Sequence, residues 1–75
     1  MSPRAPILTA RKIMRVLLSL GFAKIRQNGS HIFFKHPDGR STVVPNHSNE
    51  DIGKGLLRQI LREVELGPEE LLKLL

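Results

Sequence analysis

The sequence contains no cysteine. This absence excludes a disulfide framework and a thiolate metal site, and it fits a reducing cytoplasm, where we expect the protein to lie. No apolar run approaches the roughly 20 residues that a membrane-spanning helix needs. The opening residues, MSPRAP, also lack the apolar stretch of a signal peptide. We therefore expect neither a secretory leader nor a membrane partner.

Several residue sets that enzymes use are also missing. The chain has no cysteine nucleophile and no glycine-rich phosphate loop, and we expect no paired acids within reach of each other for general acid–base work. Its three histidines, His31, His36 and His47, are five and eleven residues apart, and these intervals match no common zinc-ligand pattern. We therefore expect no metal and no cofactor. Histidine remains the residue type suited to proton transfer, because its ordinary pKa of about 6.5 lies near cellular pH.

Acids are scarce in the first two thirds of the chain. Residues 1–49 hold eight Lys or Arg and one acid, Asp38, whereas residues 50–75 hold four Lys or Arg and six acids. The net charge of +5 therefore comes from the first part. A basic surface attracts phosphate through counterion release, whatever the base sequence of the nucleic acid. The charge favours nucleic-acid contact, although a solvated basic protein without such a partner would have the same composition.

The length of 75 residues predicts one small domain. Two prolines in the first six residues indicate a loose lead-in over residues 1–8, followed by a single domain over residues 9–75. A chain of this size buries only about 60% of the surface that it exposes when unfolded. Its stability is therefore small, and a bound partner would add to it.

The first regular element is a helix, which we predict over residues 9–20. Thr9 suits the N-cap, and Gly21 ends the apolar pattern as a C-terminal glycine does, with Phe22 placed to fold back on the last turn. Four apolar residues recur at helical spacing: Ile13, Val16, Leu17 and Leu20.

A β-hairpin follows the helix. Asn28-Gly29 tolerates the positive φ of a two-residue type I′ turn, so we predict strands over residues 22–27 and 30–36. In this register Arg26 faces His31. Side chains alternate across a sheet, which gives a core face made of Ala23, Ile25, Ile32 and Phe34. The opposite face is basic and holds one imidazole and one aromatic ring, in the set Lys24, Arg26, His31, Phe33 and Lys35.

A second turn and a third strand come next. Pro37-Asp38-Gly39-Arg40 has the proline and glycine of a turn, and Ser41 to Val44 reads as a strand that Pro45 closes. Asn46 to Gly53 is polar and reads as a loop.

The chain ends in helical sequence. Apolar residues at helical spacing predict a second helix from about Lys54 to Val64, which Gly67 stops. Pro68 suits the start of a short last helix. Its leucines are expected to dock on the core: Leu71, Leu72 and Leu75.

The element order predicts a two-layer α+β domain, α-β-β-β-α with a short last helix. Both long helices have one apolar stripe and need the same face of the three-stranded antiparallel sheet. The other sheet face is therefore left open, with His31 on it or at its edge.

His31 is the first candidate for chemistry. A guanidinium such as that of Arg26 holds a phosphate and stabilises the charge that builds on it during transfer. A phosphate, a proton carrier and a cation are sufficient for cutting RNA without a metal, because the RNA's own 2′-hydroxyl attacks the adjacent phosphorus. From the residues alone, His31 is more often an ordinary cross-strand residue on a wet face.

The other two histidines, His36 and His47, are more ordinary residues by their sequence positions. His36 is expected to line a turn. His47 is a second candidate for proton transfer, since one histidine must otherwise serve as both acid and base. As a residue of a polar loop, it is equally a solvated side chain.

Six further residues are candidates for holding RNA. Ser30, beside the turn, is placed to orient a phosphate, and Phe33 is placed to stack a base, unless the chain ends or a partner cover it. Lys54, between two glycines, resembles the start of a phosphate-binding helix, although the bare motif is weak. The remaining three are cations of the predicted basic face that contact the phosphate backbone: Lys24, Arg26 and Lys35.

The run GF…RQNGSHIFFKHPDGRSTVVPNH…GKGLLRQIL resembles the HicA-type toxins of bacterial and archaeal toxin–antitoxin modules. The hallmark is Gly29-Ser30-His31 after the first strand. It is accompanied by the turn at residues 36–39, the strand end at residues 44–47 and the second-helix run at residues 55–61. The order and spacing of these pieces make the resemblance specific, and it covers roughly residues 13–75.

The resemblance implies a fold like the double-stranded RNA-binding domain and a small endoribonuclease that cleaves mRNA. It implies that His31 is the essential catalytic residue and that a HicB-type antitoxin covers the active face. Leu56 departs from the threonine that is common in the family, and residues 1–8 fall outside the match. We expect a monomer when the protein is free.

One alternative function stays open at this point. A binding module of the same fold would read RNA by shape across its minor groove without cutting it. A second alternative is an interaction protein whose basic face serves only an acidic partner. Growth arrest on expression separates the toxin from the plain binder, and a steep salt dependence separates RNA contact from protein contact.

Overall fold

The computed structural model describes residues 8–47 and 50–75. The lead-in predicted over residues 1–8 therefore lies outside the described residues, apart from Leu8. In chain order the elements are β1 (Leu8–Thr9), α1 (Ala10–Ser19), β2 (Ala23–Asn28), β3 (His31–Lys35), β4 (Ser41–Pro45), β5 (Asp51–Ile52), α2 (Lys54–Glu63) and α3 (Pro68–Leu74).

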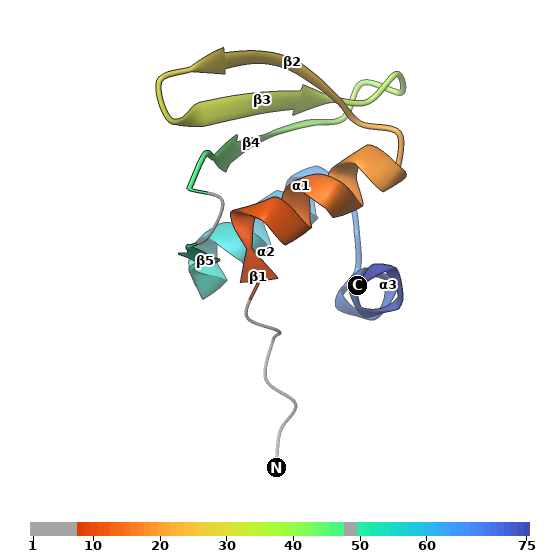
Figure 1. Ribbon diagram of the computed structural model, residues 1–75. Helices are drawn as coiled ribbons and strands as arrows, with labels where there is room; N and C mark the ends of the chain where they lie inside the picture. Colours follow the sequence, from red (N-terminus) through yellow and green to blue (C-terminus); the bar gives the residue numbers. More distant parts are fainter. Residues whose placement is uncertain (1–7, 48–49) are drawn as a thin grey trace.

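The described part of the chain forms two layers. One is an antiparallel sheet with the strand order β2-β3-β4. All three helices lie on one side of this sheet, and none of the described residues covers its other side (Figure 1). The predicted two-layer α+β fold, with the α-β-β-β-α order of the double-stranded RNA-binding domain, is confirmed.

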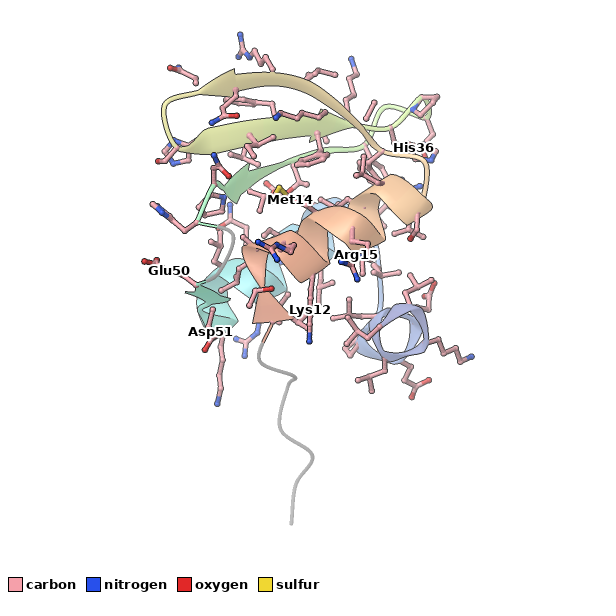
Figure 2. All side chains as sticks on the ribbon, viewed as in Figure 1. Lys12, Met14, Arg15, His36, Glu50 and Asp51 are labelled. Carbon is pink, nitrogen blue, oxygen red and sulfur yellow. The ribbon has the colours of Figure 1, made fainter. Side chains whose placement is uncertain are left out.

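The core lies between the sheet and the helices. Its fully buried side chains come from both layers, with Phe34 and Val44 from the sheet and Ile13, Leu17 and Ile60 from the helices. Met14 is partly buried against this core, and its side chain lies between α1 and the sheet (Figure 2). The apolar stripes that the helical spacing predicts are therefore the surfaces that hold the two layers together.

A short ladder that the sequence analysis missed joins the starts of the two long helices. β1 pairs with β5, so that Leu8 lies opposite Ile52 and Thr9 opposite Asp51. The prediction of a plain loop over residues 46–53 was wrong at this point, and Leu8 is 2% exposed in the core instead of loose. Strands of two residues are too short to give an alternating pattern. The ladder sets the first turns of α1 and α2 at the same end of the molecule (Figure 1).

The end of α1 follows the prediction closely. Gly21 has a φ of +98°, which glycine adopts without steric cost. Its N–H donates to Leu18 O at 3.1 Å, and the N–H of Phe22 donates to Leu17 O at 3.0 Å. These two bonds form a Schellman motif, which satisfies carbonyls that the helix leaves free. The same motif turns Phe22 back into the core, where it is 2% exposed.

The hairpin turn lies one residue later than predicted. Asn28 pairs with His31, so Gly29 and Ser30 are the two central residues instead of Asn28 and Gly29. Gly29 has a φ of +60°, whereas Ser30 has no positive φ. A positive φ at the first central residue alone is the pattern of a type II′ turn, and a type I′ turn needs it at both. The predicted pairing of Arg26 with His31 was therefore wrong, and Arg26 lies opposite Phe33.

β2 also departs from the predicted face pattern. The register shifts between Lys24 and Arg26, which is a β-bulge at Ile25. Ala23 and Ile25, predicted for the core face, are exposed, and Ile25 keeps 55% of its surface in solvent. The other half of the prediction is confirmed, because Ile32 and Phe34 are buried. β2 is an edge strand, and a bulge together with charges on such an edge discourages pairing with other chains.

α2 ends one residue earlier than predicted, and the left-handed residue that follows the helix is not a glycine. The helix stops at Glu63, and Glu65 instead of Gly67 takes the left-handed conformation, with a φ of +57°. The N–H of Leu66 donates to Leu61 O at 2.9 Å, and that of Glu65 donates to Arg62 O at 3.2 Å. This is a second Schellman motif, with a glutamate in the place that glycine usually fills.

Glu65→Gly should stabilise the protein slightly. The left-handed conformation costs an L-residue about 1–2 kcal/mol, while glycine costs about 0.4–1 kcal/mol by loosening the unfolded chain. We expect the free energy of unfolding to rise by about 0.5–1 kcal/mol, measured by urea titration. Glu69→Gly, at a right-handed helical position of α3, is the control and should destabilise instead. A loss of stability in Glu65→Gly would contradict the assignment of strain to this residue.

α3 docks by fewer residues than predicted. Pro68 opens the helix as expected, and Leu71 is 1% exposed in the core. Leu72 and Leu75, however, keep 56% and 53% of their surface in solvent. The prediction that all three leucines pack on the core was correct only for Leu71, because a helix this short presents one side of each turn to the core.

Candidate functional site

His31 is the first residue of β3 and is exposed. It follows directly on the Gly29-Ser30 turn, and its neighbours across the sheet are Asn28 on β2 and Pro45 on β4. The turn therefore presents the imidazole at the end of the sheet, flanked by a strand on each side. This position fulfils the expectation of an accessible histidine on the open face or its edge.

His47 leaves the sheet at the same end. The N–H of Asn46 donates to Ser30 O, and the N–H of His47 donates to Pro45 O at 3.0 Å. These bonds tie the end of β4 to the hairpin turn, and Pro45 lies directly opposite His31. Both histidines are exposed. The structure thus brings the two predicted proton carriers to one end of the sheet.

The open sheet face carries a stacked cation. The guanidinium carbon of Arg26 lies 4.5 Å from the centre of the Phe33 ring, within the range of a cation–π contact. Phe33 is half-buried and lies opposite Val43 on β4. Lys35, two residues further along β3, is exposed on the same face. The predicted combination of cations and an aromatic ring is therefore present, although Arg26 stacks on Phe33 and does not pair with His31.

An apolar strip runs beside these cations. Ile25, Phe33 and Val43 line a shallow surface hollow together with Lys35 and Ser41. The bulge produces this arrangement, since it sets two β2 residues opposite one β3 residue. Exposed apolar side chains rimmed by charge are typical of surfaces that bind a partner.

Lys24 and Lys54 lie apart from this face. Lys24 pairs with the buried Phe34, so it belongs to the helix-facing side of the sheet, although its own side chain is exposed. Lys54 is the first residue of α2, after the N-cap Gly53. It therefore lies at the end of the molecule that holds the hairpin turn and the end of β4 (Figure 1).

The surroundings of His47 are of mixed charge. A small hollow there is bordered by Pro45, His47 and Gly53 and also by two acids, Glu50 and Asp51. Both carboxylates project outward at the β5 end of the molecule (Figure 2). This part of the surface is therefore less positive than the open sheet face.

His36 has a structural position that the sequence analysis did not foresee. Its Nε2 lies 3.1 Å from Leu20 O, and its Nδ1 lies 3.1 Å from the backbone N of Asp38. The ring also packs edge-on against Phe22, with 5.1 Å between the ring centres. Figure 2 shows His36 beside the end of α1, far along the sheet from the hairpin turn. The residue lines a turn as predicted, and in addition it ties that turn to the end of α1.

Asp38 and Arg40 hold the same turn. The backbone N–H of Arg40 donates to Asp38 Oδ1 at 3.0 Å, and Arg40 Nε donates to Oδ2 at 2.7 Å. These bonds, the backbone one first, lower the pKa of the Asp38 carboxyl below its ordinary value. Arg40 also donates to Val64 O at 2.6 Å, which links the turn to the end of α2. The only acid of the first two thirds is thus a structural residue.

In residues 8–47 and 50–75 there is no group of three or more histidine, cysteine or acidic side chains that could hold a metal ion. Over the same residues no helix is long and apolar enough to cross a membrane.

The comparisons with known proteins give one result. No curated protein sequence matches the chain significantly. The sequence model of one family, described as the HicA toxin of bacterial toxin–antitoxin, matches residues 10–66. This match covers more than half of the chain and includes the whole three-stranded sheet and both long helices. The chain therefore belongs to the HicA family of bacterial toxin–antitoxin toxins.

Proposed function

We propose that this HicA-family toxin is an endoribonuclease that cleaves mRNA without a metal ion, by histidine acid–base catalysis in the cytoplasm. The observation that carries the proposal is the exposed side chain of His31, a residue that pairs with Asn28 and Pro45 at the end of the sheet. A histidine that served only the fold would have packing partners or hydrogen bonds, as His36 has.

The reaction needs two proton transfers. A base takes the proton of an RNA 2′-hydroxyl, whose oxygen forms a bond to the adjacent phosphorus. The bond from phosphorus to the 5′ oxygen then breaks, and an acid gives that oxygen a proton. The products are a 2′,3′-cyclic phosphate and a 5′-hydroxyl. His31 is our candidate for the first transfer, and His47, which leaves β4 beside the same turn, is our candidate for the second.

The open sheet face would hold the substrate beside these histidines. The stacked Arg26 and Phe33 offer a flat surface for a base and a cation for a phosphate. Lys35 adds a second cation on the same face, and Ser30 in the turn is placed to bind a phosphate oxygen. Lys54 at the start of α2 adds a cation at the same end of the molecule. Lys24, on the other side of the sheet, is the weakest member of the predicted set.

The same face also suits an antitoxin. As a toxin of a toxin–antitoxin module, the chain has an antitoxin partner, and we propose that it is of the HicB type and covers His31. The apolar strip of Ile25, Phe33 and Val43 is bordered by Lys35 and by the guanidinium that stacks on Phe33. It fits a partner surface with an apolar centre and acidic groups opposite these two cations. Such a cover would exclude RNA from the imidazole while the antitoxin lasts.

Incubation of the purified chain with RNA tests the proposal. We expect cleavage that continues in EDTA and leaves 2′,3′-cyclic phosphate ends. RNA with 2′-O-methyl groups lacks the attacking hydroxyl, so it should stay intact and serves as the matched substrate control. Expression in bacteria should arrest growth and degrade transcripts. A binding module without catalysis would leave the transcripts intact. Cleavage that EDTA abolishes and zinc restores would contradict the metal-free mechanism.

A further inference from the structure

The solvent side of α2 carries a row of cations that the proposed site does not use in full. Lys54, Arg58 and Arg62 follow one another at four-residue intervals and are all exposed. A step of four residues advances about 6 Å along an α-helix and about 40° around it. The three side chains therefore form a stripe about 12 Å long, which we call the α2 basic stripe.

One acid lies beside this stripe within residues 8–47 and 50–75, and none forms a salt bridge with it. The other residues on that side of α2 are Gly55 and Gln59, which line a surface hollow with Arg58 and Arg62. Glu63, the only acid of α2, also borders the hollow, but it accepts a hydrogen bond from Thr42 Oγ1 at 2.8 Å. The salt bridges of the described residues are both made by Asp38, so none involves the stripe.

Helix stability does not account for Lys54 or for the close spacing of the three cations. Like charges four residues apart repel each other on a helix surface. Lys54 also lies in the first turn, at the positive end of the helix dipole, where the helix has no acid and no side-chain cap. An acid at position 54 would favour the helix more, whereas Arg62, in the last turn, suits the negative end of the dipole. A departure from local stability rules is expected where a surface has a binding role.

The chemistry of the stripe points to a polyanion instead of a protein surface. Protein interfaces have an apolar centre, whereas the exposed residues of α2 are three cations, a glutamine, a glycine and one acid, with no apolar side chain among them. Arginine, the residue at two of the three positions, binds phosphate with two parallel hydrogen bonds. The stripe begins at Lys54, at the end of the molecule that holds the His31 turn (Figure 1).

We propose that the α2 basic stripe binds the phosphate backbone of the RNA, so that the substrate runs from the cut site along the helix layer. This inference rests on the proposed ribonuclease function. It adds Arg58 and Arg62 to the substrate contacts and assigns them to affinity, independent of base sequence, and not to the chemical step.

A salt titration of binding tests the stripe. The probe is a fluorescent single-stranded 2′-O-methyl RNA, which the chain binds without cutting, and the readout is anisotropy between about 50 and 200 mM salt. The slope of log K against log salt is negative, and in the variant Arg58→Gln/Arg62→Gln it should become less steep by about 1.4. Each phosphate contact to a single strand contributes about 0.7 to its size. With cleavable RNA, the KM of this variant should rise while kcat changes little.

A second double variant is the matched control. Arg11 and Arg15 are also exposed arginines four residues apart, on α1. Arg11→Gln/Arg15→Gln therefore removes the same charge with the same spacing from another helix, and its slope should stay near the wild-type value. Glutamine is close to arginine in helix propensity, so both variants should give the wild-type circular dichroism spectrum and melting curve.

The outcomes separate this inference from the proposed function. If the wild-type chain does not bind RNA at all, the proposed function fails. If it binds RNA and the α2 variant has the wild-type slope, only the stripe proposal fails. An equal decrease in the steepness of the salt dependence in both double variants would also overturn the stripe proposal, since net charge and not the stripe would then set the affinity. Loss of binding to an acidic protein partner with an unchanged RNA slope would assign the stripe to that partner instead.

Discussion

His31→Ala should reduce RNA cleavage by about 10²–10⁴-fold, the usual contribution of a positioned acid or base. The fold should be unaffected, because the side chain is exposed and surface substitutions of this kind change stability by about 0.5 kcal/mol or less. Affinity for 2′-O-methyl RNA should also remain near the wild-type value, since the phosphate contacts come from other residues. The variant protein should no longer arrest growth when it is expressed.

Two variants sharpen this test. Asn28→Ala removes the neighbour of His31 across the hairpin and should leave the cleavage rate near the wild-type value, which separates proton transfer from damage to the turn. His47→Ala decides whether two histidines share the acid and base roles, because a wild-type rate would assign both to His31. If folded His31→Ala still cuts RNA at the wild-type rate, the catalytic assignment is wrong.

The element order was predictable because each element has a strong local signal. The apolar stripes of α1 and α2, the turn at residues 36–39 and the cap at Gly21 each act within a few residues of chain. The hairpin register was not predictable from the same signals, since Asn28-Gly29-Ser30 contains two competing turns. Asn-Gly suits a type I′ turn and Gly-Ser suits a type II′ turn. The burial of Ile32 and Phe34 does not decide between them, because the edge strand β2 adjusts to either register with a bulge.

The candidate site was therefore predicted in outline and not in its pairings. The exposure of His31 follows from the alternation along β3, which the buried Ile32 and Phe34 establish. The residue opposite Arg26 depends on the position of the turn. Because the turn was predicted one residue too early, His31 was expected opposite Arg26 in place of Phe33. The role of His36 and the β1–β5 ladder depend on contacts between distant parts of the chain, and no local pattern reports them.

Gly21→Ala should lower the free energy of unfolding by about 2–3 kcal/mol. A positive φ alone costs a residue with a Cβ about 1–2 kcal/mol. The added Cβ would also lie 3.1 Å from His36 Nε2, closer than an ordinary contact. His36 would then have to move, and its hydrogen bond to Leu20 O is worth about 1 kcal/mol.

Gly39→Ala carries the first of these costs without the second. Gly39 has a φ of +102°, close to the +98° of Gly21, but an added Cβ there meets nothing within 4 Å. Its substitution should therefore cost only the backbone strain, about 1–2 kcal/mol, and urea unfolding of the two variants should differ by about 1 kcal/mol. When both glycine substitutions are made in a His36→Ala protein, Gly21→Ala should cost no more than Gly39→Ala, because the crowded ring is then absent. Equal costs at the two glycines would mean that the His36 ring yields freely and does not tie the turn to α1.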